Sequence, residues 1–241
     1  MLATRIIPVL LSRGSVLVKG TKFNPWRSVG IAVQAARVHA SRAVDELIIL
    51  DVGATAEGRS PDFNTIKELT QDCFCPLAVG GGVKSLDDIR LLLAAGADKV
   101  IIGTAAQDGT FIRRAANRFG SQAITVVADH DEQHYVRPRV KALSWAMEMQ
   151  YWGAGEILLQ AKERDGMMTG YDIELIGIVS RALDIPVIAC GGCSGPEDML
   201  TAIHAGASAV AAGALFQFTD HTPASCAAYL AEHGIETRIA A

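Results

Sequence analysis

The stretch PLAVGGG at residues 76–82 returns 110 residues later as PVIACGG at residues 186–192. The last residues of the two stretches, Gly82 and Gly192, keep this offset, and so do three further pairs: Glu46 and Glu156, Asp62 and Asp172, and Gly96 and Gly206. Chance rarely maintains such a register, so the chain is expected to contain two copies of one structural unit. The two halves are expected at about residues 1–120 and 121–241.

Short apolar segments alternate with amphipathic ones in both halves, which is typical of parallel strands joined by helices. The expected strands are RIIPVLL, ELIIL, PLAVGGG, KVIIG, AITVVAD, EILLQ, PVIACGG and AVAAG. The expected helices include IAVQAARVHA, DFNTIKELTQ, SLDDIRLLLAAG and PEDMLTAIHAG, with Ser85 and Ser194 as N-caps and Gly96 and Gly206 at helix ends. Four strands and four helices in each half predict an α/β fold, a single (β/α)₈ TIM barrel over residues 1–241.

The composition limits the classes of protein to which the chain could belong. Half of the residues are hydrophobic, and the formal net charge is −4 with both signs present, which argues against general nucleic-acid binding. No apolar run approaches the length of a membrane span, and the first residues, MLATRIIPVLL, lack a secretory cleavage pattern. We therefore expect a cytoplasmic protein that binds neither nucleic acid nor a membrane.

Two close pairs of cysteines raise the question of a zinc site. Cys73 and Cys75 precede an expected strand, whereas Cys190, followed by Cys193, ends another. The pairs should therefore lie at opposite ends of a parallel barrel, too far apart to share an ion. We expect no metal and no cofactor. A nucleophilic role for Cys190 would require a basic neighbour, which the sequence does not identify.

Glycines gather at the expected carboxyl ends of the strands, which form the active face of this fold. The candidates for phosphate binding are Gly81, Gly82, Thr104, Gly191, Gly192, Gly213 and Ala214. Glycine lets backbone N–H groups approach an anion, and a following helix N-terminus adds partial positive charge. Because such clusters occur in both halves, we expect a small molecule with a phosphate at each end. Tight strand-to-helix turns are the simpler alternative.

The chain resembles the cyclase subunit of imidazole glycerol phosphate synthase, the HisF family, over nearly its whole length. The resemblance rests on MLATRII, VKGTKF, DELIILD, VGGG, GADKV, FGSQA, GAGEILL, RDGMMTGYD and YLAEHGI. It implies a lyase of histidine biosynthesis that uses ammonia from a glutaminase partner on a bis-phosphorylated ribulosyl intermediate. The products are imidazole glycerol phosphate and an aminoimidazole carboxamide ribotide. Two aspartates, at the ends of the first and fifth strands, act there as general acid and base.

The catalytic pair of the family is only half present. Asp129, in VVADHD, matches the fifth-strand aspartate, although an aspartate there could also cap a helix or turn. The first-strand aspartate falls on Leu11, which can neither accept nor donate a proton. Losing one such group typically costs about 10²- to 10⁴-fold in rate. The hairpin after the fifth strand, DEQHYVRPRV, is also short, so the resemblance predicts altered cyclase chemistry.

Further positions of the active face match the family in part. Lys19, in LVKGTKF, matches a lysine on a flexible loop that engages substrate, unless it is an ordinary surface lysine. Asp51 and Asp165 match polar strand-end residues, and Thr104 matches a phosphate contact. Three residues depart from the family: Gln160 replaces a threonine, Glu163 an aspartate and Cys190 a serine.

The opposite end of the barrel retains the features that the family uses to receive ammonia. The matching gate residues are Arg5, Glu46, Lys99 and Glu156, and Asp98 matches a position that faces the glutaminase. These charges could instead form a solvated barrel floor. The resemblance predicts a heterodimer with a HisH-like glutaminase at the amino-terminal face, with ammonia entering the barrel there.

Three functions remain open. The favoured one is a HisF-like paralogue in a glutamine amidotransferase complex, which passes ammonia to a sugar amidotransferase that converts an acetamido group into an acetamidino group. The chain resembles such paralogues at DVGATAEGRSPDF and GASAVAAGALF. The first alternative is a working cyclase in which Asp51 or Glu163 replaces the missing aspartate. The second is the related phosphoribosyl isomerase, which has the same half-barrel repeat.

Overall fold

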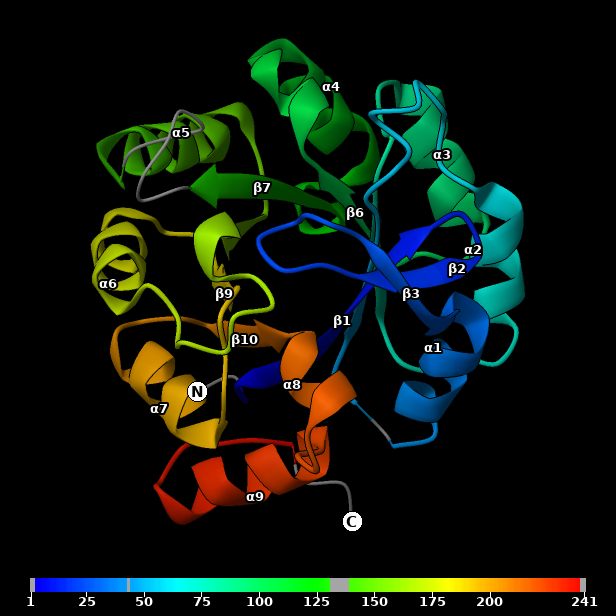
Figure 1. The fold of residues 1–241 in the computed structure, drawn as a ribbon. Helices are drawn as coiled ribbons and strands as arrows, with labels where there is room; N and C mark the ends of the chain where they lie inside the picture. Colours follow the sequence, from blue (N-terminus) through cyan, green and yellow to red (C-terminus); the bar gives the residue numbers. More distant parts are fainter. Residues whose placement is uncertain (1–2, 43, 131–138, 239–241) are drawn as a thin grey trace.

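The computed structural model describes residues 3–42, 44–130 and 139–238. Its parallel strands form a closed barrel, because the last strand pairs with the first (Figure 1). The barrel strands are β1 (Arg5–Arg13), β4 (Leu47–Asp51), β5 (Leu77–Gly80), β6 (Lys99–Ile102), β7 (Ile124–His130), β8 (Glu156–Ala161), β9 (Val187–Cys190) and β10 (Ala209–Ala212). All eight coincide with segments that the sequence predicts to be strands, so the predicted TIM barrel is confirmed.

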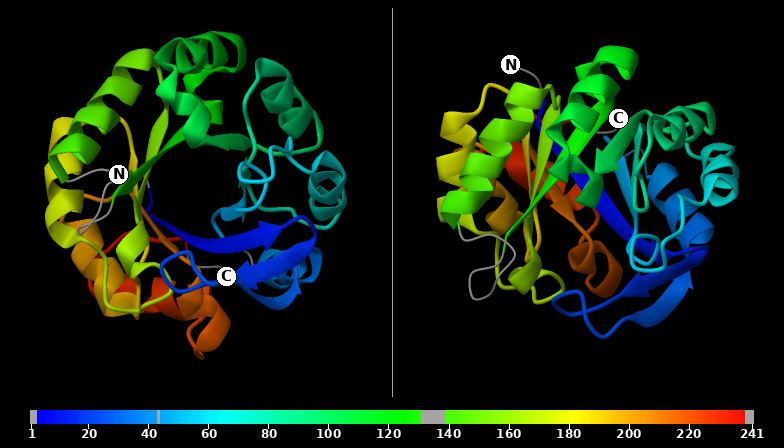
Figure 2. Two further views of the ribbon diagram at one scale, coloured as in Figure 1. Left: turned by 45° about the horizontal axis from the view of Figure 1, so that its top comes forward. Right: turned by 90° about the horizontal axis from the view of Figure 1, so that it is seen from above.

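Helices surround the barrel (Figure 2). They are α1 (Ala32–Ala40), α2 (Phe63–Thr70), α3 (Leu86–Ala94), α4 (Gly109–Phe119), α5 (Arg139–Trp152), α6 (Ile173–Ala182), α7 (Pro196–His204), α8 (Ala214–Phe218) and α9 (Pro223–Glu232). Short 3₁₀ turns follow β6, α4 and β8: η1 (Thr104–Gln107), η2 (Ser121–Ala123) and η3 (Lys162–Arg164). The four helical segments named from the sequence correspond to α1, α2, α3 and α7.

Residues 110 positions apart have the same local roles in the two halves. Asp62 begins α2 and accepts a hydrogen bond from the N–H of Thr65 at 3.1 Å. Asp172 begins α6 and accepts one from the N–H of Leu175 at 3.2 Å. Each carboxylate satisfies one of the N–H groups that a helix start leaves without an intrahelical partner.

The two predicted serine caps have different outcomes. Ser85 does cap α3, because its hydroxyl accepts from the N–H of Asp88 at 3.1 Å. The prediction for Ser194 is wrong by one residue, since Gly195 is the N-cap of α7. The Ser194 hydroxyl instead donates to Oδ2 of Asp198 at 2.6 Å, and the Ser194 N–H bonds the same oxygen at 2.8 Å.

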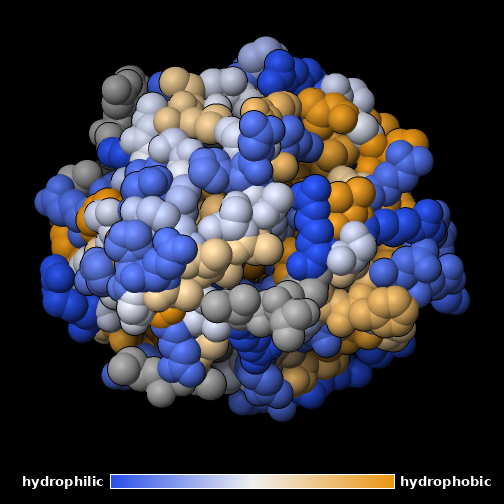
Figure 3. All heavy atoms as spheres, turned by 90° about the horizontal axis from the view of Figure 1, so that it is seen from below, coloured by the Kyte–Doolittle hydropathy of each residue, from blue (hydrophilic) through white to orange (hydrophobic). Residues whose placement is uncertain are grey.

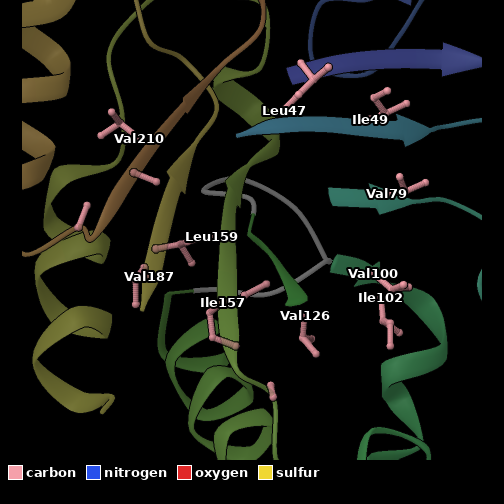
Figure 4. Close-up of a cluster of buried hydrophobic side chains, with 14 of the residues drawn as sticks. Leu47, Ile49, Val79, Val100, Ile102, Val126, Ile157, Leu159, Val187 and Val210 are labelled. Atoms are coloured by element: carbon pink, nitrogen blue, oxygen red, sulfur yellow. The ribbon is translucent and has the colours of Figure 1, made fainter. Parts of the chain in front are cut away.

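Alternating strand residues build two separate apolar layers. One layer packs between the strands and the helices, and Figure 4 shows part of it, including Val100, Val126 and Ile157. The other fills the barrel interior and includes Ile48 and Ile188 from different strands. Strand residues of even spacing face the same side, so this alternation decides which side chains reach the barrel interior.

An antiparallel hairpin follows β1, and the sequence prediction did not include it. Its strands are β2 (Val16–Lys19) and β3 (Arg27–Ile31), and β2 pairs with the end of β1. In Figure 2 the hairpin extends across the carboxyl end of the barrel. Its connecting segment packs on the loop after β8, where the N–H of Lys22 donates to the carbonyl oxygen of Asp165 at 2.8 Å. The hairpin therefore covers part of the expected active face.

The outer surface is mixed in character. On the side turned downward in Figure 1, hydrophilic residues alternate with smaller hydrophobic groups (Figure 3). Val16, Ile31 and Val38 are among the exposed hydrophobic residues, 40%, 50% and 48% exposed respectively. Within the described ranges, no helix is long and apolar enough to cross a membrane.

Candidate functional site

Four charged side chains form a ring at the amino-terminal end of the barrel. Arg5 donates to Glu46 at 2.6 Å and also to Glu156. The Lys99 ammonium contacts Glu46 at 2.9 Å and Glu156 at 3.0 Å. Cations and anions thus alternate around a closed ring, and the glutamate side chains are only 3% and 7% exposed. This geometry differs from a solvated floor, where each charge would face water.

The ring borders an apolar interior. Ile7, Ile48, Ala78, Ile101 and Leu158 belong to one cluster, and each is 2% exposed or less. These side chains offer no hydrogen bonds, so an ion placed among them would lose its hydration without compensation. Next to the ring, Asp98 is exposed, and its carboxylate accepts from the N–H of Leu77 at 2.8 Å.

A cavity of about 180 Å³ opens at the carboxyl end of the barrel on the side of β4 to β8. Its lining includes five residues predicted as site residues: Asp51, Gly81, Gly82, Thr104 and Asp129. Gly103 also lines the cavity, and a Cβ built there would meet no atom within 4 Å. Packing therefore does not require glycine at position 103, and its absent side chain leaves space beside the N–H groups that begin η1.

The carboxylate of Asp51 is fully engaged. Arg59 holds both of its oxygens, at 2.9 and 3.2 Å, and the N–H groups of Gly14, Gly53 and Ala54 donate to it at 3.3, 3.0 and 3.1 Å. These five donors occupy both carboxylate oxygens, and the two bonds from Arg59 are charge-assisted. Asp51 thus fixes the loop after β4.

A second, almost filled cavity lies on the other side of the barrel mouth. Its free volume is about 10 Å³, and its lining includes Leu11, Lys19, Asp165, Gly191, Gly192, Gly213 and Ala214. The Lys19 ammonium occupies the space next to Gly213, where a Cβ would approach it to 2.7 Å. Lys19 is 3% exposed, which excludes the alternative of an ordinary surface lysine.

Lys19 is a buried cation with weak compensation. In the described part of the chain, its nearest carboxylate oxygen is that of Asp165, at 3.9 Å. Burial raises the pKa of Asp165, and the positive charge of Lys19 opposes this effect. The other oxygen of Asp165, Oδ2, is buried with no hydrogen-bond partner there. A buried charge is stable only when it is paired, so this arrangement is suited to an added anion.

The two positions of the family's acid/base pair differ in polarity. Asp129 lies at the end of β7, opposite Gln160 of β8, and its carboxylate is 3.9 Å from the Lys162 ammonium. Leu11 is 3% exposed and packs in the interior apolar cluster. Glu163, considered as a replacement, lines neither cavity and contacts the Lys22 ammonium at 3.1 Å. Among the residues that the structure describes, the lining of the second cavity contains one carboxylate, that of Asp165, which lies across from Lys19.

The paired glycines have a packing reason as well. Gly81 and Gly191 have φ of +107° and +93°, which disfavours any side chain. A Cβ on Gly81 would overlap the backbone of Asp51, and one on Gly191 would overlap the backbone of Ala161. Tight turns therefore account for these two glycines, whereas no turn or packing contact among the described residues requires glycine at position 103.

The sequence analysis noted Gln160 only as a departure from the family and did not assign it a role in the site. Gln160 lines both cavities, is 4% exposed, and its Nε2 has no hydrogen-bond partner in the described part of the chain. A detectable signal existed, because Glu156, Leu158 and Gln160 have the even spacing of inward-facing residues.

The remaining predictions concern the positions of the cysteine pairs and the segment after the fifth strand. The structure places Cys73 and Cys75 before β5 and Cys190 at the end of β9, at opposite ends of the barrel. Among the described residues, no three His, Cys, Asp or Glu side chains are grouped to hold a metal ion. Most of the DEQHYVRPRV segment, residues 131–138, lies outside the described residues.

Comparisons with known proteins agree over the whole barrel. A family model described as histidine biosynthesis protein matches residues 5–222. A hisF2 protein of Campylobacter jejuni, provisionally named an imidazole glycerol phosphate synthase subunit, is 41% identical, covering 99% of this chain and 100% of that protein. The imidazole glycerol phosphate synthase subunit HisF of Dictyoglomus thermophilum is 39% identical, with 99% and 100% covered.

Proposed function

Because the chain belongs to the histidine biosynthesis protein family, we propose that it is a HisF-like synthase subunit that receives ammonia from a glutaminase. The glutaminase docks on the amino-terminal face, ammonia enters through the charged ring, and the carboxyl end binds a bis-phosphorylated ligand. The cyclase chemistry is impaired, so the main role is ammonia delivery.

The single observation that carries this proposal is an intact charged ring below an altered acid/base pair. Arg5, Glu46, Lys99 and Glu156 contact one another, while Leu11 faces the interior where the family has a carboxylate. The apolar interior between the two ends supports passage of neutral ammonia rather than ammonium, since an ion would lose its hydration without compensation.

The two cavities support a ligand with two anionic groups. Gly103 leaves open space next to Thr104 in the first cavity. In the second cavity, the Lys19 ammonium has one carboxylate oxygen at 3.9 Å and little free volume around it. An entering phosphate would pair with Lys19 and displace it from Gly213, which gives the second site an induced fit.

The loss of cyclase chemistry follows from the absence of a substitute for the missing aspartate. Asp51 is held by Arg59 and three backbone N–H groups, and Glu163 lies outside both cavities. Asp129 can still move a proton at the rim of the first cavity, but one carboxylate cannot act simultaneously as acid and base.

The proposal also includes the protein that consumes the ammonia. We infer a third protein, a sugar amidotransferase that converts an acetamido group into an acetamidino group, as the consumer. The similarity to a hisF2 protein, a second member of the family by its name, favours a paralogue over the histidine-pathway subunit.

A working cyclase remains the second candidate, favoured by a different observation. The first cavity keeps Asp129, Gly82 and Thr104 together, and the chain is 39% identical to a HisF subunit. On this view Asp165, buried opposite Lys19 with a raised pKa, would hold or release the second proton.

Docking of the glutaminase can be tested by co-purification. The full-length chain, tagged, is co-expressed with each HisH-like glutaminase of the source organism, and the expected result is a one-to-one complex. Asp98→Lys should weaken the complex at least about tenfold, since it reverses a charge on the docking face. Asp87→Lys is the matched control, because Asp87 is an exposed aspartate at the opposite end, in the first turn of α3. Failure of every glutaminase to co-purify would contradict the proposal.

A further inference from the structure

Two thiols lie in contact on the amino-terminal face. Cys73 and Cys75 precede β5, and their Sγ atoms are 3.4 Å apart. Both side chains are half-buried and free, so a small reagent can reach them. Phe74, between them, is 92% exposed. The proposed ammonia delivery uses none of these three residues.

The other cysteines provide a contrast within the same chain. Cys190, Cys193 and Cys226 are 5%, 4% and 0% exposed. Burial raises the pKa of all three thiols, to about 12 for Cys193 and about 11 for Cys226. Since the thiolate is the reactive form, these three cysteines are expected to be inert.

The contact between the half-buried thiols of Cys73 and Cys75 favours one thiolate. A hydrogen bond from Cys75 lowers the pKa of Cys73 to about 7, against the opposing effect of burial. The pKa of Cys75 is raised in turn, chiefly by the same hydrogen bond. The pair therefore loses its first proton near neutral pH and retains the second, as expected for two coupled sites.

We propose that Cys73 and Cys75 form a peroxide-sensitive thiol pair that closes reversibly into a disulfide. The thiolate sulfur attacks one peroxide oxygen, the O–O bond breaks, and the leaving hydroxide takes up a proton as water. The resulting sulfenic acid is attacked by the second sulfur, the S–O bond breaks, and a second water leaves. Overall the two thiols lose two electrons and two protons, and hydrogen peroxide is reduced to two waters.

Disulfide formation changes the amino-terminal face. The sulfurs must approach from 3.4 Å to about 2.05 Å, which closes a small ring through Phe74. The loop is tied to the barrel floor, because the carbonyl of Pro76 accepts from the N–H of Leu47 at 2.9 Å and Asp98 holds the N–H of Leu77. Phe74 would thus change its orientation beside the first residues of β4 and β5, Leu47 and Leu77, which flank the charged ring.

The pair is tested on the full-length reduced protein with hydrogen peroxide. After brief exposure, the protein is unfolded in guanidinium chloride with N-ethylmaleimide present to block all remaining thiols, and peptides are analysed by mass spectrometry. The expected product is a peptide with residues 73–75 that lacks two hydrogens and both alkyl groups, while the three buried cysteines stay alkylated. Dithiothreitol should restore both thiols.

Single serine variants separate a pair from two independent thiols. Cys73→Ser and Cys75→Ser should each stop at a sulfenic acid that a 1,3-diketone traps, and should be oxidised at least about tenfold more slowly than the pair. Oxidation of Cys190, Cys193 or Cys226 before the pair would overturn the proposal. So would conversion of Cys73 and Cys75 to separate sulfinic acids, or no reaction under peroxide that oxidises free cysteine.

Discussion

Removing Lys99 from the charged ring should destabilise the barrel, and the amount can be worked from the contacts. In Lys99→Met the stem is retained, but Glu46 and Glu156 lose ammonium contacts at 2.9 and 3.0 Å and share Arg5 alone. Breaking a buried ion pair costs about 3–5 kcal/mol. Because Lys99 is 21% exposed, solvent screens part of this, and we expect about 2–4 kcal/mol.

The assay is urea unfolding at pH 7, with two comparisons. Lys67→Met is the matched control, since Lys67 is exposed on α2, and it should change stability by less than about 0.5 kcal/mol. In Lys99→Met/Glu156→Gln one cation again faces one carboxylate, so at least about 1 kcal/mol should be recovered. Equal stability of Lys99→Met and Lys67→Met, or full additivity in the double variant, would refute the reasoning.

Three further results are expected. Burial lowers the pKa of His39 to about 4, so the stability that this residue contributes above pH 6.5 should be lost as pH falls from 6.5 to 4, by up to about 3 kcal/mol; His39→Leu should remove this pH dependence in urea unfolding. Gly81→Ala should cost more than about 2 kcal/mol, because its Cβ overlaps the backbone of Asp51 at positive φ, whereas Gly103→Ala should cost less than about 1 kcal/mol yet weaken phosphate binding in calorimetry. Lys19→Met should abolish most of the rise in melting temperature that a bis-phosphorylated ribulosyl ligand produces, and an unchanged rise would contradict anion binding at the second cavity.

The barrel could be predicted because its signals are local and repeated. The 110-residue register puts Asp62 and Asp172 at equivalent helix starts, and it puts Gly96 and Gly206 two residues after the ends of α3 and α7. Hydrophobic alternation fixes which strand residues face inward. The repeat and the alternation depend on spacing along the chain, whereas the ring of charges was expected only from the resemblance to the HisF family.

The composition of the site was less predictable because it depends on contacts between distant segments. Arg59 takes up both oxygens of Asp51, which leaves a predicted ligand-binding carboxylate as a loop anchor. Lys19 is buried only because the β2–β3 hairpin folds over the barrel mouth, and Gly20 and Gly14 within LLSRGSVLVKG gave no hairpin signal strong enough to predict it. Ser194 is not an N-cap because α7 begins one residue later, with Gly195 at the position equivalent to Ser85.

The central claim, an ammonia-receiving barrel whose cyclase chemistry is impaired at Leu11, is tested most directly by turnover of the bis-phosphorylated ribulosyl substrate with excess ammonium salt. External ammonia removes the need for the glutaminase in the assay. Wild type is compared with Leu11→Asp and with Leu11→Asn, because asparagine has the shape of aspartate but transfers no proton. The account predicts no measurable wild-type or Leu11→Asn turnover and a gain of about 10²-fold or more in Leu11→Asp. Robust turnover by the wild type would contradict it and would identify the chain as a working cyclase.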